Sequence, residues 1–220
     1  AIDLKGHTQG ARPAILAHRP CPVQASYLGY PGTMGCDFID YILGDEIVVP
    51  PEHAAFFSEK IVHLPGCYQL NDSNRPRPPA PPRAELGLPE DAFVFCSFNN
   101  NWKITAPVFD VWMRLLATVP GSVLWLLADN DEARRNLCLA AEMRDIVSSR
   151  LVFAPRLKLA EHLARHGAAD LFLDTLPYNA HTGASDALWM GLLLVTCLGT
   201  SFAGRVAASL LQAVGLPELA

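Results

Sequence analysis

The sequence has no run of lysine and arginine, and its overall charge is weakly acidic. Its 220 residues hold 17 Lys and Arg against 22 Asp and Glu, a formal net charge of −5. This balance gives no basic surface for nucleic acid or for an anionic membrane. The apolar run around Leu192 is interrupted by Gly191 and falls well short of the ~20 residues that span a bilayer. We therefore expect neither a nucleic acid nor a membrane as a partner.

Closely spaced cysteine pairs are also absent. The six cysteines are scattered and lie mostly in apolar runs, so we expect them to be reduced, as in a cytoplasmic protein. Half of the residues are apolar and 18% are charged, which is typical of a globular protein with one large or two small domains. The chain begins in mid-pattern at Ala1 without an initiator methionine, and we expect it to be part of a longer protein.

Residues 171–198 carry the most informative pattern. An apolar run, Leu171–Asp174, ends at a proline turn; small residues then lead into Ala187–Met190, and a second apolar run follows Gly191. We predict a strand, a loop, a helix and a strand. A helix that begins at the carboxyl end of a buried strand directs its free N–H groups and the positive end of its dipole at one place. The segment therefore predicts an anion site.

Side chains of the same loop extend this site. His181 and Thr182 can donate hydrogen bonds to a diphosphate, and Asp186, one helical turn on, is an acceptor suited to sugar hydroxyls. A histidine before a helix can also be a simple cap, but the small residues beside it leave more room than capping requires. The combination suggests a nucleotide sugar.

This loop resembles the donor-binding loop of the protein O-linked N-acetylglucosamine transferases, a cytosolic glycosyltransferase family. The family loop reads His-Thr-Thr and, two residues later, Asp followed shortly by Leu-Trp; here the segment contains His181, Thr182, Gly183, Asp186 and Trp189. Gly183 replaces the second threonine, which removes one hydroxyl donor but keeps the backbone N–H. The resemblance implies that these loop residues bind the donor.

The first part of the chain resembles the same family. The predicted strand Val23–Tyr27 leads into a turn with three glycines and a proline, whose backbone can approach a ligand closely. On the residues alone, a plain surface turn is the stronger interpretation. Gly-Tyr-Pro-Gly-Thr followed by Asp40 and Tyr41 recurs in the family beside the sugar pocket, which implies that Gly29 and Pro31 contribute to that pocket.

A proline-rich segment separates two globular stretches. Residues 71–85 hold five prolines and no apolar periodicity, and we expect a linker over 71–88 rather than a polyproline ligand. Further strands are predicted at Ala92–Phe98, Ser122–Ala128 and Leu151–Ala154, and helices at Pro107–Val119, Asp131–Ser148 and Leu159–His166. Strands and helices that alternate in this way predict a doubly wound parallel sheet, which binds ligands at the carboxyl ends of its strands.

The predicted fold class is α/β. Through the resemblance it becomes a two-lobed fold of the GT-B type. Residues 1–70 would be the C-terminal part of the N-terminal, acceptor-side lobe, and residues 89–220 would be the nucleotide-sugar-binding lobe after the linker.

Two further groups follow predicted strands. Asn99–Asn101, Trp102 and Lys103 come directly after one strand, and a lysine there could close over a phosphate, although a helix cap and a solvated lysine are an equal alternative. The resemblance assigns Asn100 to the donor phosphates and Lys103 to the departing nucleotide.

His162 and Arg165 lie three residues apart on a predicted helix and could lie along a planar base, although a surface pair is equally common. In the family, a histidine and an arginine at this spacing lie against the uracil ring.

The triplet Asp129–Asp131 has the spacing of a metal-binding motif found in other glycosyltransferases. It precedes a predicted helix, where Asp and Asn are preferred caps, and we favour the cap. A helix terminus, His181 and Lys103 already balance the phosphate charge. We therefore expect no metal and no cofactor beside the donor substrate.

The resemblance implies an enzyme that transfers N-acetylglucosamine from UDP-N-acetylglucosamine to Ser or Thr hydroxyls of proteins, inverting and without a metal. Lys103 and His181 would be catalytic, and Arg205 would support them. Tetratricopeptide repeats often present the acceptors in this family; the chain has no such repeat, so we expect them upstream, together with the family's functional histidine of the first lobe. The 220 residues alone are expected to be inactive. A Spindly-related O-fucosyltransferase with a GDP-fucose donor and a degenerate, non-catalytic nucleotide-sugar-binding module remain alternatives.

Overall fold

The computed structural model describes residues 1–128 and 130–220 and divides them into two compact units. The first unit comprises Ala1–Asn71 with Leu198–Glu218 and Ala220, and the second comprises Asp72–Cys197 with Leu219. The chain therefore returns to the first unit near its end, whereas the sequence had assigned everything after residue 88 to one lobe.

Helix α6 (Val206–Ala213) shows why the final stretch groups with the first unit. Its Ser209 hydroxyl donates a 2.6 Å hydrogen bond to the buried carboxylate of Asp45, which also accepts from the Tyr68 amide at 2.8 Å. Buried polar groups require such partners, so this helix is tied to residues more than 140 positions earlier. Local sequence patterns carry no information on such a contact.

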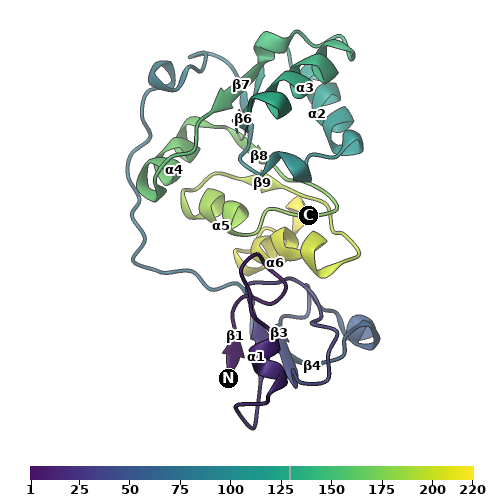
Figure 1. The fold of residues 1–220 in the computed structure, drawn as a ribbon. Coiled ribbons are helices and arrows are strands. Elements are labelled where there is room, and N and C mark those ends of the chain that lie inside the picture. Colours follow the sequence, from purple (N-terminus) through teal and green to yellow (C-terminus); the bar gives the residue numbers. More distant parts are fainter. Residues whose placement is uncertain (129) are drawn as a thin grey trace. The chain divides into compact units, whose positions relative to one another are not determined.

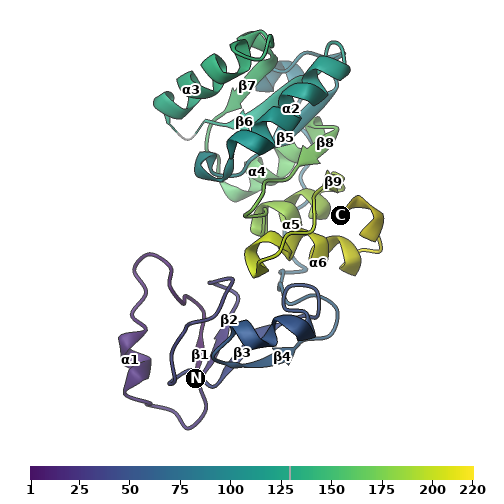
Figure 2. The same ribbon diagram turned by 90° about the vertical axis from the view of Figure 1, so that its right-hand side faces the viewer.

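The first unit holds a sheet of four short parallel strands in chain order (Figure 2). They are β1 (Ile2–Asp3), β2 (Ala25–Tyr27), β3 (Tyr41–Gly44) and β4 (Lys60–His63). Helix α1 (Ala14–Ala17) lies between the first two strands in the chain, and the 3-10 helix η1 (Pro51–Phe56) lies between the last two. The predicted strand at Val23–Tyr27 is confirmed as β2, two residues shorter.

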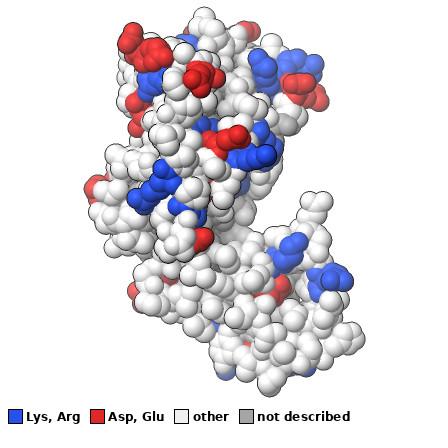
Figure 3. Space-filling view, turned by 90° about the vertical axis from the view of Figure 1, so that its left-hand side faces the viewer, with Lys and Arg blue, Asp and Glu red and all other residues white. Residues whose placement is uncertain are grey.

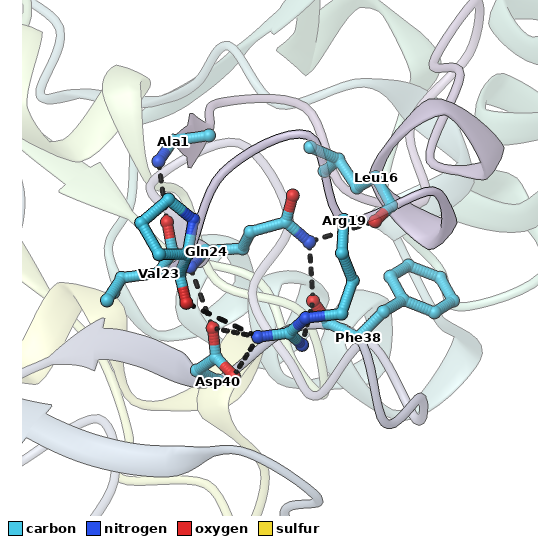
Figure 4. A network of polar contacts seen from close by, with 8 residues as sticks. Ala1, Leu16, Arg19, Val23, Gln24, Phe38 and Asp40 are labelled. Carbon is cyan, nitrogen blue, oxygen red and sulfur yellow. Dashed lines mark hydrogen bonds and ion pairs between the residues drawn. The ribbon is translucent and has the colours of Figure 1, made fainter.

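Polar contacts around Asp40 connect the long segment between β1 and β2 to the sheet (Figure 4). Arg19 donates to both carboxylate oxygens of Asp40, at 2.9 and 3.2 Å, and the Gln24 amide donates at 2.8 Å. The Gln24 side chain donates to the carbonyl of Leu16 at 2.9 Å and to that of Phe38 at 2.6 Å. The Gln24 amide, with Arg19, lowers the pKa of Asp40. The carboxylate is thus engaged within the fold.

The second unit is a doubly wound sheet of five parallel strands in the order β7-β6-β5-β8-β9. Helices α2 and α3 cover one face and α4 and α5 the other (Figures 1 and 2). The strands are β5 (Val94–Ser97), β6 (Val123–Leu127), β7 (Leu151–Ala154), β8 (Leu171–Leu173) and β9 (Leu194–Val195). The helices are α2 (Ala106–Thr118), α3 (Asp131–Glu142), α4 (Leu159–Arg165) and α5 (Thr182–Trp189). The predicted parallel α/β sheet is confirmed.

The core of the second unit lies between its sheet and α2. The expected positions Trp112 and Leu116 are 3% and 1% exposed, and Phe109 and Met113 from the same helix are also buried. Every residue of β5 and β6 is buried, as is usual for central strands covered on both faces.

Helix α3 ends earlier than its sequence pattern predicts, at Glu142 rather than Ser148. Asp145 adopts a left-handed conformation with φ of 60°, and the Ile146 amide then donates back to the carbonyl of Ala141 at 3.1 Å. This is a Schellman-type end that turns the buried Ile146 into the core.

At the N-terminal end of α3, the side chain of Asn130 accepts a hydrogen bond from the Ala133 amide at 2.7 Å, so the expected cap is confirmed for this residue. Asp129 lies outside the described residues.

The proline-rich segment, which was expected to be a linker, packs against the rest of the second unit. Arg83 donates to Asp170 at 2.7 Å. Ala80 lies so close to Gly167 that a Cβ added at Gly167 would be 2.9 Å from the Cβ of Ala80.

The short 3-10 helices are η2 (Arg83–Leu86), η3 (Asn101–Lys103), η4 (Ser148–Arg150), η5 (His166–Ala168), η6 (Phe202–Gly204) and η7 (Pro217–Leu219).

The surface of the described residues carries charges of both signs on the face that Figure 3 draws. Acidic and basic side chains are interspersed on the face drawn in Figure 3, and much of that face is uncharged. None of the helices in the described residues has the length and apolar content needed to cross a membrane. All six cysteines are free thiols.

Candidate functional site

A cavity of about 510 Å³ opens among the loops that follow the strands of the second unit. Its wall comes from the loops after β5 and β7, from the end of β6, from α4 and α5, and from the loop between β8 and α5. All eight residues that were predicted to be catalytic or to bind the donor line it: Asn100, Lys103, His162, Arg165, His181, Thr182, Gly183 and Asp186. As the carboxyl-end rule for parallel sheets predicts, these residues lie together at one cavity.

Lys103 supplies a cation to the cavity wall. It closes η3, and its Nζ donates a 2.7 Å hydrogen bond to the carbonyl of Asn179. The Nζ also lies 4.2 Å from the centre of the Tyr178 ring. Burial lowers the pKa of Lys103 to about 8, and the nearby Asp174 carboxylate opposes that shift. The ammonium is therefore charged at neutral pH but titrates just above it.

Asp174 holds the loop between β8 and α5. One of its carboxylate oxygens accepts from the Thr175 amide at 2.8 Å and from the Ala180 amide at 2.6 Å. The other accepts from the Thr196 hydroxyl at 2.6 Å. Burial raises the pKa of Asp174 to about 6 despite these donors. The carboxylate thus fixes the loop that delivers His181 to the cavity.

His181 immediately precedes α5, and its ring stacks on Tyr178 with 4.8 Å between the ring centres. Thr182 and Gly183 form the first turn of this helix, where backbone N–H groups have no acceptor within the helix. A Cβ at Gly183 would meet only Ala180, at 3.9 Å. The threonine found at this position of the family motif therefore fits without steric conflict. This part of the cavity wall combines a cation, an imidazole and free amides, which suits an anion.

The three consecutive asparagines have different surroundings. Asn99 is buried and donates to the Thr175 hydroxyl at 3.0 Å, while Asn100 accepts from Arg156 at 2.9 Å. The side-chain oxygen of Asn101 is buried without a hydrogen-bond partner among the residues that the structure describes. Of the three, Asn99 and Asn100 line the cavity.

His162 and Arg165 form a second group in the cavity wall. Arg165 is 1% exposed; it donates to Nδ1 of His162 at 2.5 Å and lies over the Phe98 ring at 4.0 Å. Burial lowers the pKa of His162 to about 3, with Arg165 adding to the shift, and burial lowers the pKa of Arg165 to about 10. The imidazole is therefore neutral and the guanidinium charged. Arg165 is thus buried and His162 half-buried, so the two are not a surface pair.

Asp186 is the one acid among the described residues that line the cavity. Its side chain is 5% exposed and forms an ion pair with Arg75 from the proline-rich segment. Its second oxygen lies 3.6 Å from Nε2 of His162. Burial raises the pKa of Asp186, and the hydrogen bond from Arg75 opposes this. The sequence suggested a free acceptor for hydroxyls; the structure shows a carboxylate that already has a cationic partner.

Sequence reasoning missed three residues of this site. Arg156 and Tyr178 line the cavity, and each follows the end of a strand, so the carboxyl-end rule could have identified them. Arg75 has no such signal, because it lies in a stretch without periodicity that sequence patterns assign to a linker.

Gly29 and Pro31 lie in the first unit, on the loop after β2. A Cβ at Gly29 would lie 2.0 Å from the backbone oxygen of Leu4, so close packing requires glycine there. The buried Glu59 accepts from the Thr33 hydroxyl at 2.6 Å and from the Met34 amide at 2.5 Å, which fixes the far side of the same loop.

Arg205 serves the backbone of the first unit. Its Nε donates to the carbonyl of Ile47 at 2.5 Å, and its Nη1 donates to that of Gly199 at 2.9 Å. These contacts support the chain entering α6.

Comparisons with known proteins identify the family. The model of glycosyl transferase family 41 matches residues 1–78 and 79–220. A probable UDP-N-acetylglucosamine–peptide N-acetylglucosaminyltransferase of Arabidopsis thaliana, SEC, is 39% identical over 98% of this chain and 23% of its own length. A second Arabidopsis protein with the same descriptive name, SPINDLY, is 34% identical over 99% of the chain and 24% of its own length. The chain thus spans about a quarter of the length of these curated relatives.

A solved structure agrees with these matches. An O-GlcNAc transferase of Thermobaculum terrenum, in a mutant form, superposes with a TM-score of 0.88 at 32% identity, over 99% of this chain and 41% of the other. The predicted fold class is thereby confirmed. This chain belongs to glycosyl transferase family 41.

Proposed function

We propose that this chain is the catalytic region of an enzyme that transfers N-acetylglucosamine from UDP-N-acetylglucosamine to Ser or Thr hydroxyls of proteins, with inversion and without a metal. The names of its relatives support this activity. The observation that carries the proposal is one cavity whose wall holds both a cationic group suited to a diphosphate, Lys103 with His181, and a guanidinium with a neutral imidazole, Arg165 with His162.

The diphosphate would lie beside Lys103 and His181. The Lys103 ammonium, the His181 ring and the first amides of α5 would bind the charge that grows on UDP as the bond to the sugar breaks. Donors placed in advance around a developing anion lower the barrier without reorganising, and each contributes about 3 kcal/mol where it has been measured. Lys103 and His181 are therefore the proposed catalytic residues.

The nucleoside would lie beside His162 and Arg165. The flat guanidinium of Arg165 and the ring of His162 suit a planar base, and Asp186 suits ribose hydroxyls. Asn100 would contact the phosphates. Thr182 and Gly183 would add their amides, since Gly183 has room for the donor where a threonine stands in the family motif.

Other parts of the proposal rest on the family resemblance. Gly29 and Pro31 would contribute to the sugar pocket, tetratricopeptide repeats would present the protein acceptors, and the location would be cytoplasmic. Nothing in the space around Gly183 favours a degenerate module, because the position accepts either residue.

Calorimetric titration with UDP, with GDP as the competing nucleotide and a chelator present, tests the donor assignment. UDP should bind and GDP should not. Lys103→Ala and His181→Ala should each weaken UDP binding by roughly tenfold or more, as expected when a hydrogen bond to a charged group is lost. Lys60→Ala, an exposed lysine on β4 of the first unit, is the matched control.

Each outcome has a defined meaning. If the chain bound GDP in preference to UDP, the proposed donor would be GDP-fucose instead of UDP-N-acetylglucosamine. A folded chain that binds neither nucleotide would contradict the proposed site.

A further inference from the structure

The start of the proline-rich segment packs on helix α5 beside the cavity. The indole N–H of Trp189 donates to the carbonyl of Pro76 at 3.3 Å, and the Arg77 guanidinium lies 4.1 Å from the centre of the Trp189 ring. Arg75 reaches further and pairs with Asp186, and its side chain is only 11% exposed. A segment that would otherwise be a spacer thus delivers a cation to the one acid of the described cavity wall.

The ion pair continues toward His162 and Arg165 in the cavity wall. Arg165 can only donate, so Nδ1 of His162 must accept its hydrogen bond. The neutral ring then carries its proton on Nε2, the nitrogen that faces the second oxygen of Asp186 at 3.6 Å. Asp186 therefore stands between Arg75 and His162, and its orientation sets the direction of both contacts.

We propose that Arg75 is a positioning residue of the nucleotide site: it keeps the Asp186 carboxylate charged and oriented, so that its second oxygen can receive a ribose hydroxyl beside His162. This inference rests on the proposed nucleotide-binding function. Removal of one partner from a buried ion pair leaves the other charge uncompensated, so Asp186 would turn away or take up a proton. A protonated or displaced carboxyl would lose its ability to distinguish a ribose from a sugar that lacks hydroxyls.

Arg77 provides a matched control. It lies two residues away in the same segment and contacts the same helix through Trp189, but its partner in the structure is an aromatic ring rather than the cavity carboxylate. Arg77→Gln should perturb the docking of the segment as much as Arg75→Gln does. Only the loss of Arg75 should reach Asp186.

The experiment compares UDP with 2′,3′-dideoxyuridine 5′-diphosphate, which lacks both ribose hydroxyls, by calorimetry on the whole chain. Wild type and Arg77→Gln should prefer UDP by about tenfold, the typical effect of a hydrogen bond to a charged group. Arg75→Gln should bind the two nucleotides almost equally, with pyrophosphate affinity unchanged. Arg75→Lys should restore part of the preference. A folded Arg75→Gln protein that keeps the wild-type preference would overturn the inference.

A ligand-free measurement separates this inference from the proposed function. The ¹⁵N shifts of the His162 ring, assigned with a His162→Gln variant, should show the proton on Nε2 in all three proteins, because Arg165 holds Nδ1 as the acceptor. The Nε2 shift should be the same in wild type and Arg77→Gln and should change in Arg75→Gln, because the carboxylate that faces Nε2 is then displaced or protonated. If wild type binds no UDP, the proposed function fails and the ribose-binding part of the inference fails with it. If UDP binds but neither the preference nor the ring shifts depend on Arg75, only the inference fails. An Arg75→Gln chain that does not fold is replaced by Arg75→Lys, whose preference and ring shifts must then lie between those of wild type and Asp186→Asn.

Discussion

Two loops of this chain, one in each unit, follow a parallel strand and are held by a buried carboxylate, but the two carboxylates have different surroundings. In the first unit, Glu59 receives the Thr33 hydroxyl and the Met34 amide of the glycine-rich loop. In the second unit, Asp174 receives two amides and a hydroxyl around the loop before α5. The two arrangements use the same solution for a sharp turn at a strand end.

The difference is the cation. Asp174 is close enough to Lys103 to oppose the fall in its pKa, so the group that shapes the second loop also helps to keep the proposed catalytic lysine charged. Glu59 instead accepts hydrogen bonds from Thr33 and Met34 of the glycine-rich loop, and the Thr33 hydroxyl also contacts the hydroxyl of Ser58. Loop shape and cation charge should therefore change together in the second unit, whereas changes in the first loop should leave nucleotide binding alone.

The substitution Asp174→Ala should have the largest effect. Two buried amides and one partly buried hydroxyl would lose their acceptor. Each unpaired buried donor costs about 1–3 kcal/mol, so we expect the unfolding free energy of the second unit to fall by roughly 4 kcal/mol. All four tryptophans, at positions 102, 112, 125 and 189, belong to this unit, so denaturant unfolding followed by tryptophan fluorescence reports on it alone. UDP affinity should fall as well.

Glu59→Ala is the corresponding change in the first unit. It should leave the tryptophan transition and UDP affinity unchanged. If both variants weakened UDP binding equally, the contrast between the loops would be wrong.

The next largest effect is expected for Gly29→Ala. The new Cβ would lie 2.0 Å from the Leu4 carbonyl oxygen, and such overpacking against backbone typically costs about 1–3 kcal/mol. Circular dichroism should show the first unit unfolding earlier, while tryptophan fluorescence and UDP affinity stay near their wild-type values. Gly32→Ala in the same loop is the control, because its nearest neighbour is a ring carbon of Tyr30 at an ordinary 3.4 Å. Equal stability of the two variants would show that the loop moves freely enough to relieve the contact.

These two loops also show how far the sequence alone could go. The alternation of apolar runs predicts the strands and helices of the second unit, and the carboxyl-end rule then brings Lys103, His162 and His181 to one cavity. Both steps need only local patterns and the topology of parallel sheets. The end of α3 was missed because it depends on Asp145 adopting a left-handed conformation, which the continuing polar pattern does not show.

Long-range pairs could not be predicted in the same way. The bond between Ser209 and Asp45 places α6 with the first unit, and the ion pair between Arg75 and Asp186 brings the proline-rich segment to the cavity. In each case the partners are more than a hundred residues apart, and one of them lies in a stretch without a distinctive motif. A single sequence contains both residues of each pair but does not show that they are in contact.

A smaller effect is expected from pH. UDP binding needs the Lys103 ammonium, whose pKa is about 8. Affinity should therefore be steady below that value and should fall as the pH rises through it, approaching tenfold per pH unit at the alkaline limit for one proton taken up on binding. Calorimetry between pH 7 and about 9.5 measures the slope. In Lys103→Arg the side chain stays charged throughout this range, so the remaining affinity should be flat; a wild-type slope in that variant would assign the titration to another group.

The smallest effect, and the closest test of the loop before α5, is Gly183→Thr. The position is open, since only Ala180 lies within reach of a new Cβ, at 3.9 Å, and threonine is better than glycine inside a helix by a few tenths of a kcal/mol. If the cavity binds a diphosphate, the added hydroxyl should hold UDP affinity or raise it, by up to about tenfold for one hydrogen bond. Gly183→Ala separates the two contributions, because it gains helix stability without a donor. Tighter binding in the threonine variant alone would show that a phosphate oxygen lies within reach of the first turn of α5, whereas weaker binding in both would mean that the ligand needs the bare backbone there.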